Sequence, residues 1–499
     1  MCGIVGYCGQ SGTVLNTLVA GLKRLEYRGY DSAGVTLLTA GSVYTQKTVG
    51  KVVALEKAIS SNPPVRVGTV GIAHTRWATH GLPTLKNAHP HSSQDQNIWL
   101  VHNGIIENYQ EIRSKLQRTG VKFKSDTDSE VVAQLIGSLY QGDLRQAVLK
   151  TVGIIKGAYA LAIVCAQEPH RLIGVKMSSP LVVGVADAEM IIASDVSALI
   201  DKTKRVVYLE DGELIDIQGT SHQIVGFDNV PVAKSIANID WDVAAASKGG
   251  YDHFLLKEIM EQPQVIQDST RGRLDEKEAN IHFGGLLDVE ARLSQIDRVI
   301  LLGIGTAYYA AKLGELYFNS LANLPAVAYM SPEFRYNQNV LDSRTWVIAI
   351  SQSGETADTI AAVQEAKRQG ALVTGIVNVV GSTISRITDA GVYNHIGPEI
   401  SVASTKAFTS QSLILLMHAL LLGRQRGLAF APAAEIIRAI KRLPTSINKV
   451  LSARLQIQRV AKGIATAKHL IYIGRQYNYP IALEGALKIK EISYIHAEG

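Results

Sequence analysis

The pattern of apolar and polar positions changes between the first and second halves of the chain. In the first half, short apolar runs predict strands, and apolar residues at helical spacing predict helices between them. Strands joined by short connections, with a few helices, indicate two packed sheets. The main strands are predicted at Ile4–Tyr7, Val35–Leu38, Val70–His74 and Ile98–His102, and the helices at Thr13–Leu25 and Ser129–Tyr140.

From about residue 290, the sequence repeats a unit of strand, polar turn and helix. This alternation predicts a parallel, doubly wound α/β sheet, in which ligands bind outside the carboxyl ends of the strands. The strands are predicted at Arg298–Leu302, Thr345–Ile350, Leu372–Val377 and Gly391–Ile396.

A faint internal repeat predicts that another unit of this kind begins near the end of the chain. Leu301–Glu315 aligns with Leu470–Glu484, and a strand and a helix from Pro480 are expected there. Glu484, Lys488 and Glu491 are spaced i, i+4, i+7 and share one helix face. A surface ion-pair ladder would have the same spacing, but the apolar neighbours of these residues argue against it.

Between the two halves, Ser221–Ser247 has no sustained periodicity and predicts a domain junction. Lys257–Pro263, in a helix predicted from Asp252, is charged and amphipathic, which is typical of a surface helix. We therefore expect a first domain at 2–220, a linker and connecting helix at 221–288, a second domain at 289–430, and the start of a third at 461–499.

Composition narrows the class of protein. The chain has 499 residues, of which 46% are hydrophobic, so it is expected to form about three globular domains. Its formal charge of +6 is spread without a Lys/Arg block, which disfavours nucleic acid as a partner. Three cysteines fit neither a disulfide framework nor a zinc site. The apolar helix Ser412–Gly423 is too short to span a membrane, so we predict a soluble, cytoplasmic protein.

The first residues, Met1-Cys2-Gly3, suggest a catalytic nucleophile. Removal of Met1 would leave Cys2 with a thiol and a free α-amine whose reference pKa is about 8, so a nucleophile would lie beside a base. Asn103 and Gly104 could donate to a developing oxyanion. Arg76 and Asp128 suit the carboxylate and the amine of an amino acid. Taken singly, these residues also fit a chance Met-Cys, an Asn-Gly turn, a surface Arg and a helix cap by Thr127 or Asp128.

The carboxyl ends of the strands in the second half are rich in hydroxyl groups. Ser351, Gln352, Ser353 and Thr356 lie at a predicted helix N-terminus, where N–H groups and the helix dipole favour a phosphate. Simple helix capping is the alternative. The sequence has no P-loop, and Gly303-Ile304-Gly305 lacks the third glycine of a dinucleotide site. We predict neither a metal nor a cofactor.

Five stretches of the first half together resemble the glutaminase domain of N-terminal-nucleophile amidotransferases. They are Cys2–Gly6, Tyr27–Gly34, His74–Gly81, Val101–Gly104 and Thr127-Asp128. The resemblance implies a four-layer α/β/β/α domain that hydrolyses glutamine. It makes Cys2 the nucleophile and Asn103 and Gly104 the oxyanion hole. It places Arg76, Trp77, Thr79, His80 and Asp128 at the glutamine pocket, with Trp77 as a gate for ammonia.

Three stretches of the second half are similar to the sugar-isomerase (SIS) domains of the glucosamine-6-phosphate synthase family: Ser351–Thr356, Val402–Lys406 and Ala482–Glu491. This resemblance implies transfer of ammonia to fructose 6-phosphate and isomerisation, a step of amino-sugar synthesis. Glu491 would shuttle the proton, with support from Glu484 and Lys488. The sugar phosphate would bind at Thr306, Ser351, Gln352, Ser353, Thr356, Val402 and Ala403. Ala307 stands where the family often has a Ser.

The resemblance also implies a homodimer and a longer C-terminal part, with a His and a Lys that follow Gly499 in the family. On that ground we expect the second SIS unit to be incomplete and the chain to retain only glutamine hydrolysis. Two alternatives stay open: a Cys2 amidotransferase with a different acceptor, and a regulator that only binds a sugar phosphate.

Overall fold

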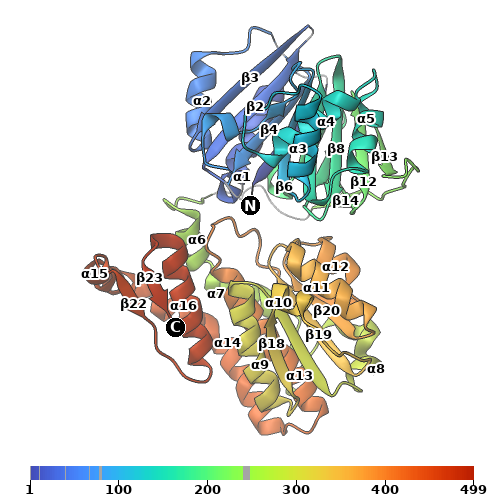
Figure 1. Cartoon of the computed structure of the whole chain (residues 1–499). Coiled ribbons are helices and arrows are strands. Elements are labelled where there is room, and N and C mark those ends of the chain that lie inside the picture. The colour runs from blue at the N-terminus through green and yellow to red at the C-terminus, as the bar shows by residue number, and fades with distance from the viewer. Residues whose placement is uncertain (1, 10–11, 40, 67, 78–80, 240–247) are drawn as a thin grey trace. The chain divides into compact units, whose positions relative to one another are not determined.

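The computed structural model describes residues 2–9, 12–39, 41–66, 68–77, 81–239 and 248–499. The chain forms two compact units, Met1–Val243 and Ala244–Gly499 (Figure 1). The predicted strand at Val70–His74 and helix at Thr13–Leu25 are both present, each with one end shifted by one or two residues.

The first unit contains two antiparallel sheets. The eight-stranded sheet has the order β14 (Ala237–Asn238), β11 (Arg205–Tyr208), β9 (Val182–Val185), β10 (Glu189–Ala193), β1 (Gly3–Gly9), β4 (Val70–Arg76), β2 (Ser32–Thr39), β3 (Ser42–Val49). The six-stranded sheet has the order β13 (Ser221–Gly226), β12 (Glu213–Gln218), β8 (Glu168–Met177), β7 (Gly157–Cys165), β6 (Ile98–Ile106), β5 (His91–Ser92).

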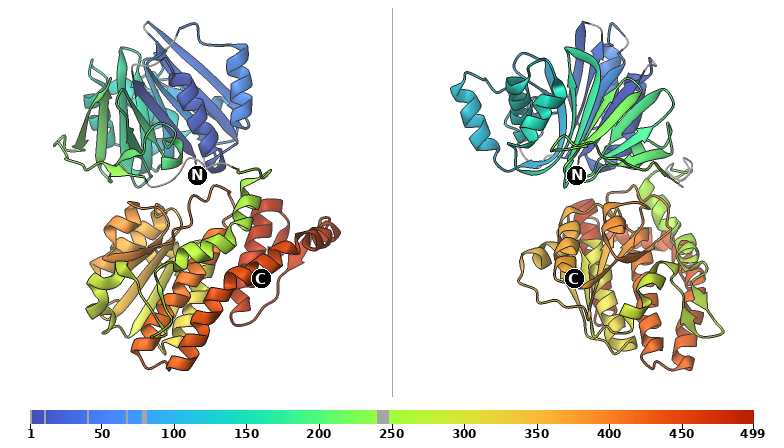
Figure 2. Two further views of the ribbon diagram at one scale, coloured as in Figure 1. Left: turned by 180° about the vertical axis from the view of Figure 1, so that it is seen from behind. Right: turned by 90° about the vertical axis from the view of Figure 1, so that its right-hand side faces the viewer.

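Helices cover the outer face of each sheet, which gives four layers (Figure 2). On β1, Val5 and Tyr7 pack against helices, whereas Ile4 and Cys8 face the other sheet, as the period of two along a strand requires. The helices are α1 (Val14–Leu25) and α2 (Val52–Ser61) on one side, and α3 (Tyr109–Arg118), α4 (Asp128–Leu139) and α5 (Leu144–Val152) on the other.

Two expectations for the first unit are wrong. Strand β6 does not end at Asn103-Gly104 but continues to Ile106, so this dipeptide pairs with Ala160 and Tyr159 and forms no turn. The junction does not begin at Ser221, because β13 pairs with β12 and belongs to the sheet. The edge strand β13 is held by backbone hydrogen bonds to β12, which require no alternation of apolar residues. The hydrophobic pattern therefore did not predict it.

The second unit is built on a five-stranded parallel sheet, as predicted. Its order is β18 (Ala326–Met330), β17 (Arg298–Gly303), β19 (Thr345–Ser351), β20 (Leu372–Val377), β21 (Ala390–Tyr393). One face is covered by α9 (Thr306–Leu321) and α13 (Lys406–Gln425), and the other by α10 (Ser331–Tyr336), α11 (Ala357–Arg368) and α12 (Thr383–Ile387). The remaining elements are α6 (Phe254–Met260), α7 (Gln262–Thr270), β15 (Leu274–Asp275), β16 (Asn280–Ile281), α8 (Glu290–Leu293), α14 (Phe430–Ser452) and α15 (Arg454–Ile464).

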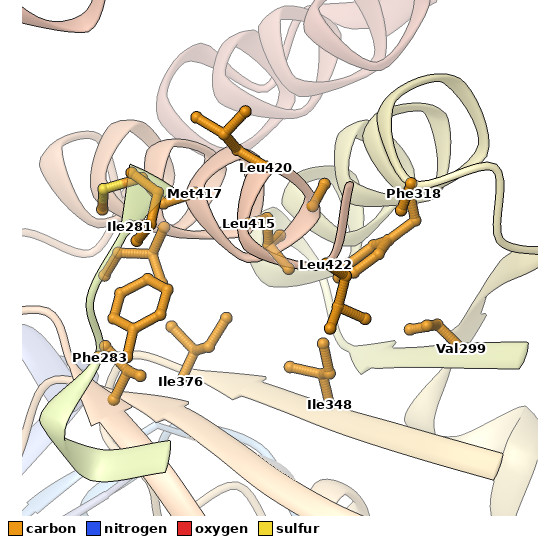
Figure 3. Packing of buried hydrophobic residues seen from close by; sticks show 14 of the residues in the cluster. Ile281, Phe283, Val299, Phe318, Ile348, Ile376, Leu415, Met417, Leu420 and Leu422 are labelled. Carbon is orange, nitrogen blue, oxygen red and sulfur yellow. The ribbon is translucent and has the colours of Figure 1, made fainter. Parts of the chain in front are cut away.

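Helix α13 is longer than the sequence pattern indicated. With 20 residues it is long and apolar enough to cross a membrane by length and composition, but most of it is buried. Leu415 and Leu422 pack toward Ile348 and Phe318 in the core of this unit (Figure 3). It is therefore the core helix of a doubly wound sheet.

The repeat near the end of the chain also has a structural counterpart. Strand β22 (His469–Ile471), helix α16 (Asn478–Ser493) and strand β23 (His496–Glu498) form a β–α–β element whose two strands are parallel. Pro480 lies in the first turn of α16, where its missing N–H costs no helical hydrogen bond.

Candidate functional site

Cys2 lies at the start of β1, directly beside the end of β4. The backbone N–H of Trp77 donates to Sγ over 3.2 Å, and Sγ is 3.4 Å from the carbonyl oxygen of the same residue. Burial raises the pKa of the Cys2 thiol, while the Trp77 hydrogen bond and the positive charges of Arg76 and Arg28 act in the opposite direction. Cys2 is thus a thiol that needs a base to ionise. Met1, which precedes it, is outside the described residues.

Asn103 hydrogen-bonds both to the backbone of Cys2 and to His74 in the middle of the sandwich. Its Nδ2 donates to the carbonyl oxygen of Cys2 over 2.9 Å, and its Oδ1 lies 3.0 Å from Nε2 of His74. The neighbouring Gly104 has φ +125, and a Cβ there would lie 1.9 Å from the carbonyl oxygen of Ala158. Only glycine fits that position. Asn103 thus lies against Cys2, and Gly104 follows it in β6, while the role of both as oxyanion donors stays a prediction.

The two predicted substrate-binding charges are buried in the same unit. Arg76, at the end of β4, donates to the carbonyl oxygens of Leu82 over 3.2 Å and of Gly81 over 3.1 Å. Asp128 begins α4 and accepts from the N–H of Ile106 over 2.9 Å. The cap of α4 is Thr127, whose side chain accepts from the N–H of Glu130 over 3.3 Å, so Asp128 is free of the capping role.

Two predicted pocket residues, Thr79 and His80, lie outside the described residues. Trp77 is half-buried, and its ring meets that of Tyr30 edge-on with the centroids 5.4 Å apart. This contact holds the ring in place, and the role of Trp77 as a gate for ammonia stays a prediction.

Two buried histidines, His74 and His102, have no role predicted from the sequence. His74 accompanies Arg76 on one face of β4 because the two are separated by one residue. Burial lowers the pKa of His74 to about 3, so the ring is neutral, and Nε2 must carry its proton to donate to Asn103. His102 bonds through Nδ1 to the hydroxyl group of Ser129 over 2.9 Å. The period of two along β4 was the signal that could have placed His74 at the site.

In the second unit, the turn after β19 is shaped by its own hydroxyl groups. Ser351 Oγ accepts from the N–H of Gly354 over 3.0 Å and lies 3.0 Å from Thr356 Oγ1. Ser353 Oγ accepts from the N–H of Glu355 over 3.2 Å. Gln352 is half-buried in the same turn. Thr356 precedes α11 but makes no capping bond with its side chain, so simple capping does not explain it.

Thr306, at the start of α9, lies beside the charged residues of α16 and forms hydrogen bonds with two of them. Its hydroxyl group donates to Glu484 over 3.0 Å and accepts from Lys488 over 2.8 Å. Lys488 also pairs with Glu491 over 2.6 Å. Glu484 and Lys488 thus meet Thr306, which follows the carboxyl end of β17, and Glu491 is joined to them through Lys488.

The two carboxyl groups of α16 differ in environment. Glu484 is buried, and desolvation raises its pKa to about 7, against the opposing charge of Lys488. Its Oε2 has no hydrogen-bond partner within the described residues. The side chain of Glu491 is 34% exposed. Burial thus brings the titration of the Glu484 carboxyl group close to neutral pH, where a general acid or base works best.

Val402 and Ala403 lie in the loop before α13, the former exposed and the latter buried. Among the described residues, no group of three or more His, Cys, Asp or Glu side chains is arranged to hold a metal ion.

Comparisons with known proteins match each of the two units to a different domain family. A glutamine amidotransferase domain family matches residues 64–226, and an SIS domain family matches residues 292–421. The "glutamine--fructose-6-phosphate aminotransferase [isomerizing]" of Aquifex aeolicus is 44% identical over 100% of this chain and 81% of its own length. Its namesake in Bacteroides thetaiotaomicron is 46% identical over 100% of this chain and 82% of its own length.

A solved structure, the C-terminal domain of glucosamine-fructose-6-phosphate aminotransferase from Francisella tularensis, is 34% identical, covers 50% of this chain and 70% of that chain, and has a TM-score of 0.48. The two family matches confirm the predicted fold class. The prediction that the chain retains only glutamine hydrolysis is not supported, because the alignment covers 81% of the relative's length and both matched domains.

Proposed function

The chain belongs to the family of isomerizing glutamine–fructose-6-phosphate aminotransferases, and on this basis we propose that it transfers the amide nitrogen of L-glutamine to D-fructose 6-phosphate. The products are L-glutamate and D-glucosamine 6-phosphate. The observation that carries the proposal is that one chain combines a thiol beside amide donors with a second unit that has a buried carboxyl group bonded to Thr306 and a hydroxyl-rich turn after β19.

In the proposed first step, the Cys2 thiolate adds to the γ-carbonyl carbon of glutamine. Asn103 and Gly104 stabilise the developing oxyanion. The intermediate collapses to a thioester and releases ammonia, which takes up the proton lost by the thiol. Water then hydrolyses the thioester to glutamate and restores the thiol. Arg76 holds the substrate carboxylate, Asp128 the ammonium group, and Thr79 and His80 complete the pocket.

In the proposed second step, ammonia adds to C2 of fructose 6-phosphate and water leaves, which gives an imine. A carboxylate removes a proton from C1 and returns one to C2, so that the ketose becomes an aldose. Ser351, Ser353, Thr356 and Gln352 bind the phosphate, together with the loop at Val402 and Ala403. The family resemblance assigns the proton transfer to Glu491, whereas burial favours Glu484.

The decisive experiment measures glutamate and glucosamine 6-phosphate after incubation with glutamine, with and without fructose 6-phosphate. Both products are expected from the unaltered chain, and Cys2→Ala is expected to release no glutamate above the uncatalysed rate. Cys8→Ala, which removes a thiol buried in the core, is the matched control and should keep its activity if folded. Glutamate release that persists in Cys2→Ala would overturn the assignment, and sugar binding without product would indicate a regulator.

The proposal includes a cytoplasmic location and a homodimer. All three cysteines are free thiols, which suits a reducing compartment. Molar mass in solution, measured by light scattering, tests the dimer, and a mass of one chain would contradict it.

A further inference from the structure

The segment Lys257–Pro263, which the sequence pattern predicts as an ordinary surface helix, has one fully engaged carboxyl group. Glu258, on α6, is 2% exposed, whereas the other residues of this helix are half-buried. A carboxylate is buried at a cost unless hydrogen bonds replace its water. Its partners should therefore show what it does.

The partners of Glu258 are all in the loop that precedes α13. Its Oε1 accepts from the N–H of Ile400 over 2.6 Å and from the N–H of Ser401 over 3.0 Å. The hydroxyl group of Ser401 donates to Oε2 and lies 2.8 Å from the carbonyl oxygen of Ala403. One side chain therefore fixes two consecutive backbone N–H groups and the hydroxyl group of Ser401.

The residues that follow α6 along the chain hold the first turn of α13, where the same loop ends. Glu261 pairs with Lys406, which is 2% exposed, over 2.8 Å. Gln262 accepts from the hydroxyl group of Thr409 over 2.6 Å. The residues between these anchors include Val402 and Ala403, so this part of the loop is held from both sides.

We propose that Glu258 is a positioning residue of the sugar-phosphate site, which fixes the backbone of Ile400 and Ser401 and thereby places Val402 and Ala403 for the sugar phosphate. The inference rests on the proposed function, because it takes these two residues as ligand contacts. Glu258 itself touches no substrate. It acts through the loop. By holding the loop in one conformation before the ligand binds, Glu258 lowers the conformational entropy that is lost on binding.

The test compares Glu258→Ala and Glu258→Gln with the unaltered chain. Glu258→Ala removes all the acceptors and is expected to weaken binding of fructose 6-phosphate about tenfold or more, as measured by titration calorimetry. Glu258→Gln keeps one acceptor oxygen and should recover part of the affinity. Glu435→Gln, on the exposed surface of α14, is the control and should bind as the unaltered chain does.

A second readout separates positioning from general support of the fold. Hydrogen exchange of the amides of Ile400 and Ser401 should become faster in Glu258→Ala at a temperature well below its unfolding transition. If Glu258→Ala only lowers the unfolding temperature and binds the sugar phosphate as tightly as the unaltered chain, the inference is wrong. If the unaltered chain itself binds no fructose 6-phosphate, the proposed function fails first, and the two failures are thereby distinguished.

Discussion

At the scale of single residues, the proposed glutaminase site depends on the hydrogen bonds that orient the side chain of Asn103. Asn103 can direct an N–H toward an oxyanion only if its amide cannot rotate. His74 opposes that rotation, because its neutral, buried ring presents the Nε2–H to Oδ1 of Asn103 over 3.0 Å and to the carbonyl oxygen of His102 over 3.1 Å. His74 thus orients the side-chain amide of Asn103 through the hydrogen bond to its oxygen atom.

Replacing His74 by Ala is expected to lower kcat for glutamine hydrolysis about tenfold to a hundredfold, since one oxyanion donor is then misplaced. KM for glutamine should change little, because Arg76 and Asp128 are not touched. His74→Gln, which can still donate an N–H, should recover part of the rate. His222→Ala, on an exposed position of β13, is the control. A change confined to KM would contradict the positioning role.

The raised pKa of Glu484 gives a pH test for the second site. Because the carboxyl group must be ionised to take a proton from C1, kcat for glucosamine 6-phosphate formation should rise between about pH 6 and 8, around the pKa of about 7. Glu484→Gln should remove this inflection as well as most of the rate. An inflection that persists in Glu484→Gln and disappears in Glu491→Gln would assign the proton transfer to Glu491 instead.

At the scale of elements, the first proposed site lies between two sheets, whereas the second lies where parallel strands end. Side chains on β4 and β6 meet between two sheets, and the turns after β17 and β19 meet at one edge of a parallel sheet. The strand–turn–helix pattern predicts this second arrangement, since the carboxyl ends of parallel strands share an edge. It does not predict that β6 continues through Asn103-Gly104, because Asn-Gly favours a turn and only pairing with β7 overrides that preference.

The tight turn before α11 is expected to tolerate no side chain at Gly354. This residue has φ +66, and a Cβ would lie 2.0 Å from Ser382 Oγ, so an added methyl group must displace the turn that holds Ser351 and Thr356. Gly354→Ala should weaken binding of fructose 6-phosphate at least about tenfold. Gly370→Ala is the matched control, since φ is +87 there but no atom lies within 4 Å. Equal loss of affinity in both variants would point to backbone strain alone.

At the scale of the whole molecule, each hydrophobic core belongs to one unit. The clusters around the two antiparallel sheets contain no residue from the parallel sheet, and the reverse also holds for the described residues. The sequence pattern predicts this division because the period of the apolar residues changes between the halves. It places the boundary too early, because β13 pairs with the preceding strand β12 and β14 pairs with the more distant strand β11, so that both belong to the first unit.

Separate cores lead to a prediction about where each ligand acts. A ligand that binds the folded state protects the amides of the unit that binds it, because local opening must then compete with binding. Fructose 6-phosphate should slow hydrogen exchange at 351–356 and 400–403, and a reagent that alkylates Cys2 as a glutamine analogue should slow it at 70–77 and 103–106. Cys2→Ala is expected to abolish the second effect and leave the first intact. Protection by fructose 6-phosphate that is confined to the first unit would contradict the assignment of the two sites, because the turn of Ser351 and the loop of Val402 would then have no part in binding the sugar.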